Sequence, residues 1–168
     1  SKLMERPVLF KRDFKQSKPR DFGFLIRPTL REYNQFVHLL DKMISDNINK
    51  DFFMNEIDYE IREKRKDGGL IVKQKATITL LKDWIDAKIR FPDPQPKDEM
   101  IKVFREIRTM RMPQAHSVEE DTFNQRYFKD QRDLIIKAYD SIRRLRLILA
   151  NHPSTKSYEV PDWLYKGE

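Results

Sequence analysis

The sequence predicts an all-α protein, an antiparallel bundle of four to five helices with an irregular N-terminal arm and a C-terminal aromatic tail. Apolar residues recur at helical spacing over most of the chain beyond Pro28, and prolines and glycines are confined to short stretches between these segments. The last periodic segment is long and keeps its apolar residues on one face. We therefore divide the chain into an arm of residues 1–28 and a helical bundle of residues 29–168.

The first three helices are predicted from caps and breakers. Thr29 with Glu32 three residues later is typical of a capping box, so the first helix is expected to begin there. Its expected core positions are Phe36, Leu39, Leu40 and Met43. The second helix is predicted over about residues 51–66, before a Gly-Gly pair, and the third over about residues 70–90, before three closely spaced prolines.

A charged residue extends the apolar face of the fourth predicted helix. Met100, Phe104 and Ile107 lie at helical spacing, and Arg111 continues the same stripe. Pro113 then ends the helix. The sequence thus predicts an arginine on the inner face of the last helical turn.

A histidine follows in the next connection. Ser117 with Glu120 is typical of a second capping box, which is expected to begin a long last helix ending near Ala150. His116 is therefore expected beside the N-terminus of that helix. Residues 160–165, which are rich in aromatic side chains, are predicted to fold back as the tail.

Composition indicates a protein without membrane spans, metals or cofactors. The chain is 39% hydrophobic and 36% charged, and its longest apolar run is far shorter than the roughly 20 residues that cross a bilayer. It has no cysteine, no histidine with a carboxylate three residues before it, and no two histidines four residues apart. We expect a cytoplasmic protein. Because the sequence begins with Ser1 and not Met, other domains of a larger chain are among its expected partners.

The arm is basic and aromatic. Residues 1–28 hold eight basic and three acidic side chains, so most of the net charge of +7 lies there. Its phenylalanines are Phe10, Phe14, Phe22 and Phe24. Such a mixture is typical of segments that attract phosphates and stack bases, but aromatic packing onto the body with solvated lysines is the simpler interpretation.

The pair Arg111 and His116 suggests chemistry on a phosphodiester. A neutral imidazole, with a pKa of about 6.5, is suited to act as the base that removes a 2′-hydroxyl proton from RNA. A guanidinium binds two phosphate oxygens and keeps its charge. One histidine does not supply the leaving-group acid at the same time, so we expect a homodimer that brings two motifs together across a two-fold axis.

Other arginines are candidate phosphate ligands. Arg108 lies one turn before Arg111 and is expected to add a phosphate contact. The last helix carries a cluster of arginines that is either a phosphate track or a solvated rim: Arg143, Arg144 and Arg146.

The stretch from Arg111 through Ala115 to His116 resembles the signature of the HEPN superfamily, an arginine followed after four to six residues by a histidine. The resemblance covers about residues 70–150, with Met112 and Pro113 departing from the usual pattern. It implies a metal-independent endoribonuclease or RNA-binding helical bundle, typically dimeric, often within toxin–antitoxin, CRISPR or phage-defence systems. It also implies Arg111 and His116 as the catalytic pair.

A structural interpretation of the same residues stays open. Arg111 is then expected to pair with Glu119, Glu120 or Asp121 at the start of the last helix. His116 is then expected to bond a backbone carbonyl in a tight connection, and His38 is interpreted as a histidine on the bundle face. On this interpretation the chain is a non-catalytic helical module for dimerisation or docking.

Overall fold

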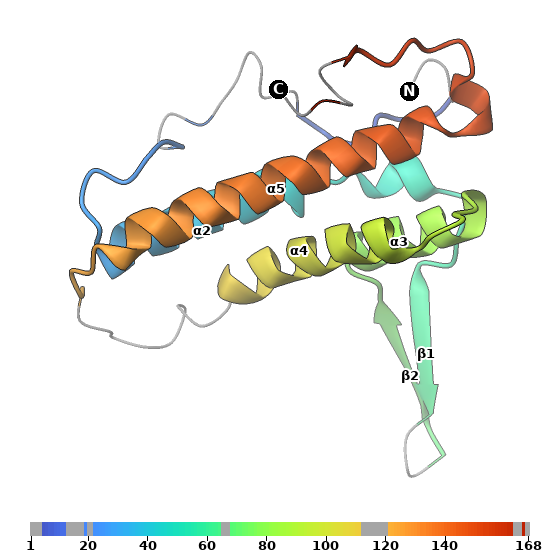
Figure 1. Cartoon of the computed structure of the whole chain (residues 1–168). Helices are drawn as coiled ribbons and strands as arrows, with labels where there is room; N and C mark the ends of the chain where they lie inside the picture. The colour runs from blue at the N-terminus through green and yellow to red at the C-terminus, as the bar shows by residue number, and fades with distance from the viewer. Residues whose placement is uncertain are drawn as a thin grey trace.

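A computed structural model of the chain describes residues 5–12, 19, 22–64, 68–111, 121–162 and 166, and the statements below concern these residues. Four α-helices are described there: α2 (Leu30–Ile44), α3 (Thr77–Lys88), α4 (Gln95–Arg111) and α5 (Arg126–Ala150). The described residues also form two strands, β1 (Glu60–Lys64) and β2 (Leu70–Gln74). There are two short 3-10 helices among them, η2 (Lys50–Phe53) and η4 (Pro153–Thr155). The helices lie side by side, and the strands project from them (Figure 1).

The predicted all-α fold is wrong, because the described chain contains an antiparallel hairpin. Strands β1 and β2 pair from Glu60 opposite Gln74 to Lys64 opposite Leu70. The helix predicted over residues 51–66 is instead η2 followed by β1, and that predicted over 70–90 is β2 followed by the shorter α3. The fold is therefore mixed α and β.

Local chemistry accounts for the difference. Asn55, between η2 and β1, has a φ of 62°, a left-handed conformation that ends a helix. Ile71 and Val72 are β-branched, and such side chains favour a pleated strand. Gly68, between the strands, has a φ of 85°, which suits a residue without a Cβ. The Gly-Gly pair thus belongs to a hairpin connection between two strands.

Helix α2 begins where the sequence predicts. The Thr29 hydroxyl accepts a hydrogen bond from the Glu32 amide at 3.3 Å and caps the helix. The Glu32 carboxylate accepts bonds from the amides of Ile26 and Arg27 instead of closing the capping box on Thr29. This cap fixes the end of the arm to the start of α2.

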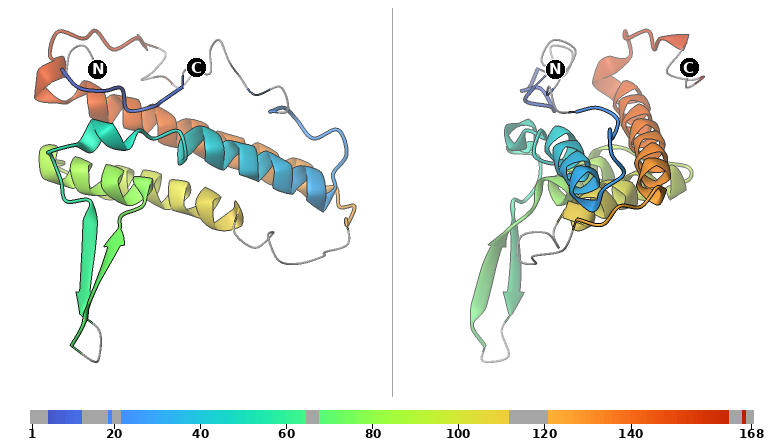
Figure 2. Two further views of the ribbon diagram at one scale, coloured as in Figure 1. Left: turned by 180° about the vertical axis from the view of Figure 1, so that it is seen from behind. Right: turned by 90° about the vertical axis from the view of Figure 1, so that its left-hand side faces the viewer.

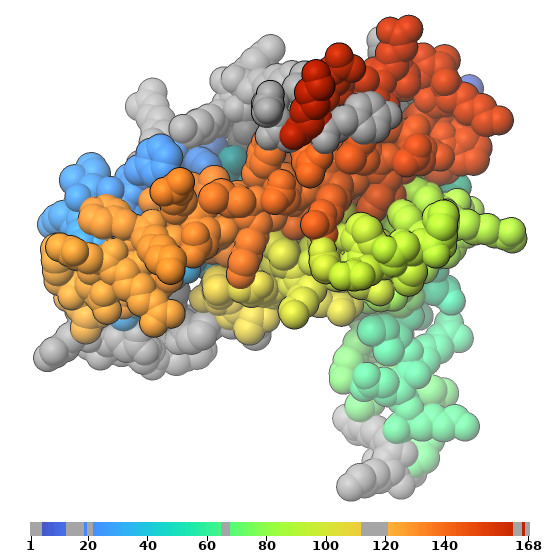
Figure 3. Space-filling model, viewed as in Figure 1, coloured from blue at the N-terminus to red at the C-terminus, as the bar shows by residue number. Residues whose placement is uncertain are grey.

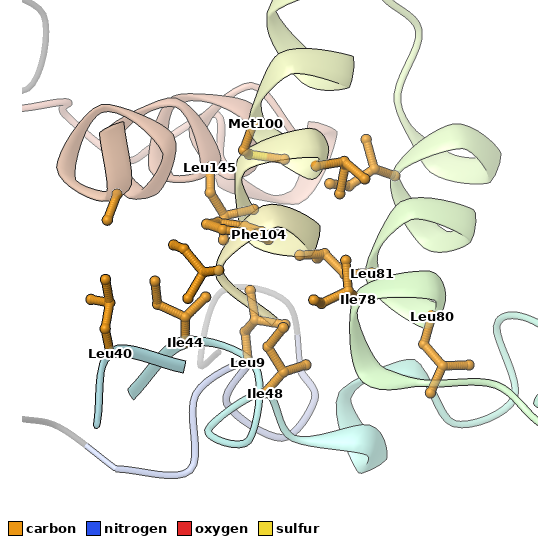
Figure 4. Packing of buried hydrophobic residues seen from close by; sticks show 14 of the residues in the cluster. Leu9, Leu40, Ile44, Ile48, Ile78, Leu80, Leu81, Met100, Phe104 and Leu145 are labelled. Atoms are coloured by element: carbon orange, nitrogen blue, oxygen red, sulfur yellow. The ribbon is translucent and has the colours of Figure 1, made fainter. Parts of the chain in front are cut away.

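The core lies between the four helices, with α4 at its centre. Met100 and Phe104 of α4 have no exposed surface and face Leu145 of α5 on one side and Leu81 of α3 on the other (Figure 4). Helix α2 contributes Phe36, Val37, Leu40 and Ile44. Burial of these side chains holds the end of α4 against α2, where the candidate site lies.

The last helix begins later than predicted. Residues 121–125 are not helical, and Phe123 forms an isolated bridge with Thr29 before α5 begins at Arg126. The expected capping box at Ser117 and Glu120 lies outside the described residues. Because residues 121–125 are not helical, a helix that begins at that capping box does not run on into α5.

Part of the arm packs on the body. Leu9 is buried, Phe10 forms a bridge with Ile48, and Phe22 stacks on Phe36 with ring centroids 5.7 Å apart. Phe24 is 81% exposed. Phe14 lies outside the described residues. The packing interpretation thus holds for Phe10 and Phe22 but not for Phe24.

The C-terminal part of the chain follows α5. The Thr155 hydroxyl in η4 lies within hydrogen-bond distance of the carbonyls of Leu149, Ala150 and His152, the nearest being that of His152 at 2.7 Å, which closes the end of α5. Trp163 to Tyr165 of the predicted aromatic tail lie outside the described residues. Of the helices that the structure describes, none has the length and apolar character needed to span a bilayer.

Candidate functional site

Arg111 ends α4 and reaches across to α2. Its Nη1 donates to Oδ2 of Asp41 at 2.6 Å and to Oδ2 of Asp46 at 3.0 Å. Its side chain is 28% exposed, so it extends the apolar stripe of α4 only to the edge of the core. The arginine is thus tied to α2 and to the residue that follows its C-cap.

Of the three partners predicted for Arg111, the structure describes Asp121. Asp121 instead accepts a hydrogen bond from the Arg31 amide at 2.9 Å, in the first turn of α2. Glu119 and Glu120 lie outside the described residues. Arg111 thus contacts the C-terminal end of α2, and Asp121 contacts the N-terminal end of the same helix.

Arg108 joins the same cluster. Its Nη1 donates to Oδ2 of Asp41 at 2.8 Å and to Oδ1 of Asp46 at 2.7 Å. Arg108 and Arg111 are three residues apart, so both face α2 from the last turn of α4, where cations also suit the helix dipole. We call these four residues, Asp41, Asp46, Arg108 and Arg111, the ion-pair cluster; its formal charge is zero.

The two carboxylates of the cluster differ in environment. Asp41 lies on the buried face of α2 with no exposed surface, and its Oδ1 makes no hydrogen bond within the described residues. Asp46 follows the C-cap residue Ser45, and its side chain is 42% exposed. Partial burial alone raises the pKa of Asp46, but hydrogen bonds from Arg108 and Arg111 outweigh this effect and lower the pKa below its usual value.

A histidine lies next to the cluster. His38 precedes Asp41 by one helical turn on α2. Desolvation lowers the pKa of His38, and the charges of Lys42 and Arg111 lower it further, against the opposing effect of Asp41 and Asp46. Among the described residues, His38 is thus the histidine that senses Arg111. His116, the predicted catalytic histidine, lies outside the described residues.

The structure does not bring the arginines of α5 to the cluster. Arg144 donates to Oε2 of Glu99 at 2.5 Å, near the beginning of α4. Glu99 precedes Arg111 by twelve residues, or about 18 Å along the helix axis. Arg143 lies 3.8 Å from Asp140, and Arg146 donates to the Tyr158 hydroxyl at 3.4 Å. These three arginines therefore lie apart from the ion-pair cluster, and the phosphate track on α5 stays a prediction.

A groove of about 970 Å³ runs along α2 beyond His38. One side is formed by residues 23–27 of the arm, including the exposed Phe24. The other is formed by α2 side chains, of which Arg31, Gln35 and His38 lie at helical spacing. The groove thus brings the exposed Phe24 and the basic Arg31 to the same side of α2 as His38.

Comparison with known proteins gives no family. No protein-family model matches the chain, and no curated protein and no solved structure resembles it significantly. Within the described residues, no group of three or more His, Cys, Asp or Glu side chains is arranged to hold a metal ion. Any function must therefore be argued from the site itself.

The cluster is suited to orient a guanidinium. Both described bonds of Arg111 run through Nη1. Sequence reasoning missed Asp41, Asp46 and His38 as parts of this site. The signal for Asp41 was a carboxylate on an apolar helix face, between Val37 and Ile44, where an unpaired charge is costly.

Proposed function

We propose that the protein is a HEPN-like domain that binds RNA and cleaves it without a metal, with the phosphodiester held at the Arg111 end of α4. One observation supports this best: the motif arginine is anchored through one nitrogen to a buried carboxylate while its side chain stays 28% exposed. Arg111 thus combines a fixed orientation with access to solvent.

An anchored arginine suits transition-state binding. The bonds to Asp41 and Asp46 are made before substrate arrives, so little side-chain freedom is lost when a phosphate binds. Arg108, 43% exposed and bonded to the same carboxylates, supplies a second cationic group.

The proposed reaction is an internal transesterification. The His116 imidazole removes the proton of the 2′-hydroxyl, and the 2′-oxygen attacks phosphorus while the bond to the 5′-oxygen breaks. Arg111 stabilises the charge on the non-bridging oxygens. The 5′-oxygen takes a proton from an acid, which we assign to the motif of a second copy. The products are a 2′,3′-cyclic phosphate and a 5′-hydroxyl.

The test is cleavage of end-labelled single-stranded RNA in EDTA by the purified protein. We expect cyclic-phosphate products from the wild type and an activity at least about 100-fold lower for Arg111→Ala and for His116→Ala. Arg105→Ala, an exposed arginine on the same helix, is the matched control and should retain full activity. Activity unchanged in both motif variants would exclude the proposal.

Loss of the fold must be separated from loss of chemistry. Arg111→Ala removes two bonds of the ion-pair cluster, so its thermal unfolding is recorded beside its activity. Asp41→Asn weakens the cluster while leaving both arginines in place. If Asp41→Asn is destabilised as much as Arg111→Ala and still cleaves RNA, the loss of activity in Arg111→Ala is not explained by stability.

The cluster also favours a second candidate function, a non-catalytic helical module for dimerisation or docking. Each guanidinium is already paired with carboxylates, and the cluster links α2 to α4 as a structural ion pair does. In this case the wild type neither cuts nor retains RNA at low salt, and Arg111→Ala changes only stability. Salt-sensitive RNA binding that Arg111→Ala weakens would favour the first candidate.

A further inference from the structure

The described part of the hairpin of β1 and β2 projects away from the helices and meets them at its base (Figure 2). The Lys75 amide donates to the Tyr59 carbonyl at 2.8 Å, and Lys75 Nζ lies 2.7 Å from Oδ2 of Asp83 in α3. Beyond this base most residues of both strands are exposed (Figure 3). A two-stranded hairpin is only marginally stable alone in water, so its outer edges are candidate pairing surfaces.

The register shows which backbone groups face outward. In an antiparallel ladder, opposed residues alternate between pairs that exchange hydrogen bonds and pairs that do not. Tyr59 and Lys75 continue the register of Glu60 with Gln74 and are a hydrogen-bonded pair. By alternation, the N–H and C=O groups of Leu70, Val72 and Gln74 point away from β1.

The two outer edges differ in charge. The residues of β1 whose backbone groups face outward are Glu60, Arg62 and Lys64, all charged. Those of β2 are Leu70, Val72 and Gln74, of which none is charged. Leu70 is 66% exposed and Val72 is 53% exposed. Charged residues protect an edge strand from pairing, and an uncharged apolar edge is a template for it. The β2 edge therefore lacks the protection that the β1 edge has.

The β2 edge is also complementary to itself. When a second copy of β2 pairs antiparallel about Val72, the two Val72 residues face each other and Leu70 faces Gln74 of the second copy. All the outward backbone groups of the strand then have partners, in about six hydrogen bonds. Lys73 falls opposite Ile71, so no like charges meet. The same pairing of β1 over its full length would oppose Arg62 to itself, which is destabilising.

We propose that the outer edge of β2 is a homodimerisation surface, at which two copies join their hairpins into one four-stranded antiparallel sheet. The occupant is a second copy of this chain because the edge matches itself in hydrogen-bonding groups, in charge and in apolar side chains. On one face of the joined sheet Leu70 and Val72 of both copies become cross-strand and diagonal neighbours. This inference does not rest on the proposed activity toward RNA.

Cysteine cross-linking tests the pairing directly. The chain has no cysteine, so Val72→Cys and Arg62→Cys each introduce a single thiol. The two positions are opposite each other on one face of the hairpin and differ mainly in which edge they border. Across the proposed axis the two Val72 Cα atoms lie about 5.5 Å apart, within the range that a disulfide spans. We expect Val72→Cys to form covalent dimers at least tenfold faster than Arg62→Cys under mild oxidation, and equal rates would overturn the proposal.

Sedimentation of thiol-free protein completes the test, without RNA and with Arg111 intact. We expect a concentration-dependent dimer for the wild type and for Arg62→Glu, and at least tenfold weaker association for Val72→Glu, which opposes two carboxylates at the axis. Circular dichroism confirms that both variants keep the helical fold. A wild type that stays monomeric, or a dimer that Val72→Glu leaves unchanged, would exclude this surface whatever the outcome of the cleavage assay.

Discussion

Nη1 of Arg111 lies 2.6 Å from Oδ2 of Asp41, a carboxylate without exposed surface. The two residues are separated by seventy positions in the chain, and their contact joins the last turn of α4 to α2. Because Arg108 donates to the same oxygen, Asp41 accepts two charged hydrogen bonds. The other two hydrogen bonds of the ion-pair cluster go to Asp46 at the surface. The order of the Arg111 end of α4 thus depends mainly on one buried carboxylate.

Asp41→Asn should destabilise the protein more than Asp46→Asn. Charged hydrogen bonds contribute roughly 1.5–3 kcal/mol each, and the Asp41 oxygen is fully shielded from solvent, so we expect a loss of about 2–3 kcal/mol in the free energy of unfolding. Asp46 is 42% exposed, and we expect its substitution to cost less than about 1 kcal/mol. Urea denaturation measures both values. Equal losses would contradict the different burial of the two carboxylates.

The pKa of His38 should rise when Arg111 is replaced by Gln. The charge of Arg111 is among the causes that lower this pKa, and its removal leaves Asp41 and Asp46 to favour the imidazolium form. NMR titration of the imidazole protons reports the change. Arg105→Gln, on the same helix but outside the ion-pair cluster, should leave the pKa of His38 where it was. A pKa that does not move in Arg111→Gln would mean that His38 and Arg111 are not coupled.

The helices were predictable from the sequence where caps and apolar periodicity agree. Thr29 begins α2 as predicted, and Met100, Phe104 and Ile107 lie on the buried face of α4. The hairpin was not predicted because its strands are only five residues long and neither shows a regular alternation of polar and apolar residues. The Gly-Gly pair was read as the end of a helix, whereas it lies between two strands.

The candidate site was only partly predictable for a different reason. The position of Arg111 on the inner face of α4 follows from helical spacing, but the identity of its partner depends on how α2 packs against α4. Acidic residues close in sequence were expected as partners, and the observed ones come from a distant helix. Long-range ion pairs of this kind have no local sequence signal beyond an apparently misplaced carboxylate such as Asp41.

Stability should fall on acidification partly through Glu56. Hydrogen bonding by Lys88 lowers the pKa of this carboxyl, and the charge of Arg6 adds to the effect. A carboxylate with a lowered pKa stabilises the fold above its usual pKa of about 4.3, and this contribution disappears as the pH falls through the lowered value. Glu56→Gln should therefore be less stable than the wild type at pH 7, and the difference should shrink as the pH falls below the usual pKa of about 4.3. Urea denaturation across this range measures it, and a constant difference would contradict the linkage.

The arm should be released when Gln131 is replaced by Leu. This side chain of α5 is 1% exposed; it donates to the Gly23 carbonyl at 3.0 Å and accepts from the Leu25 amide at 3.1 Å. Leucine of similar size leaves both backbone groups without these partners, so we expect the free energy of unfolding to fall by about 1–3 kcal/mol.

Limited proteolysis distinguishes release of the arm from general destabilisation. In Gln131→Leu the bond after Phe24 should be cut by chymotrypsin faster than in the wild type, under conditions where the helices stay intact. Arg132→Leu, at the exposed neighbouring position, is the control for the added leucine. If cleavage after Phe24 is as slow in Gln131→Leu as in this control, the amide of Gln131 does not hold the arm.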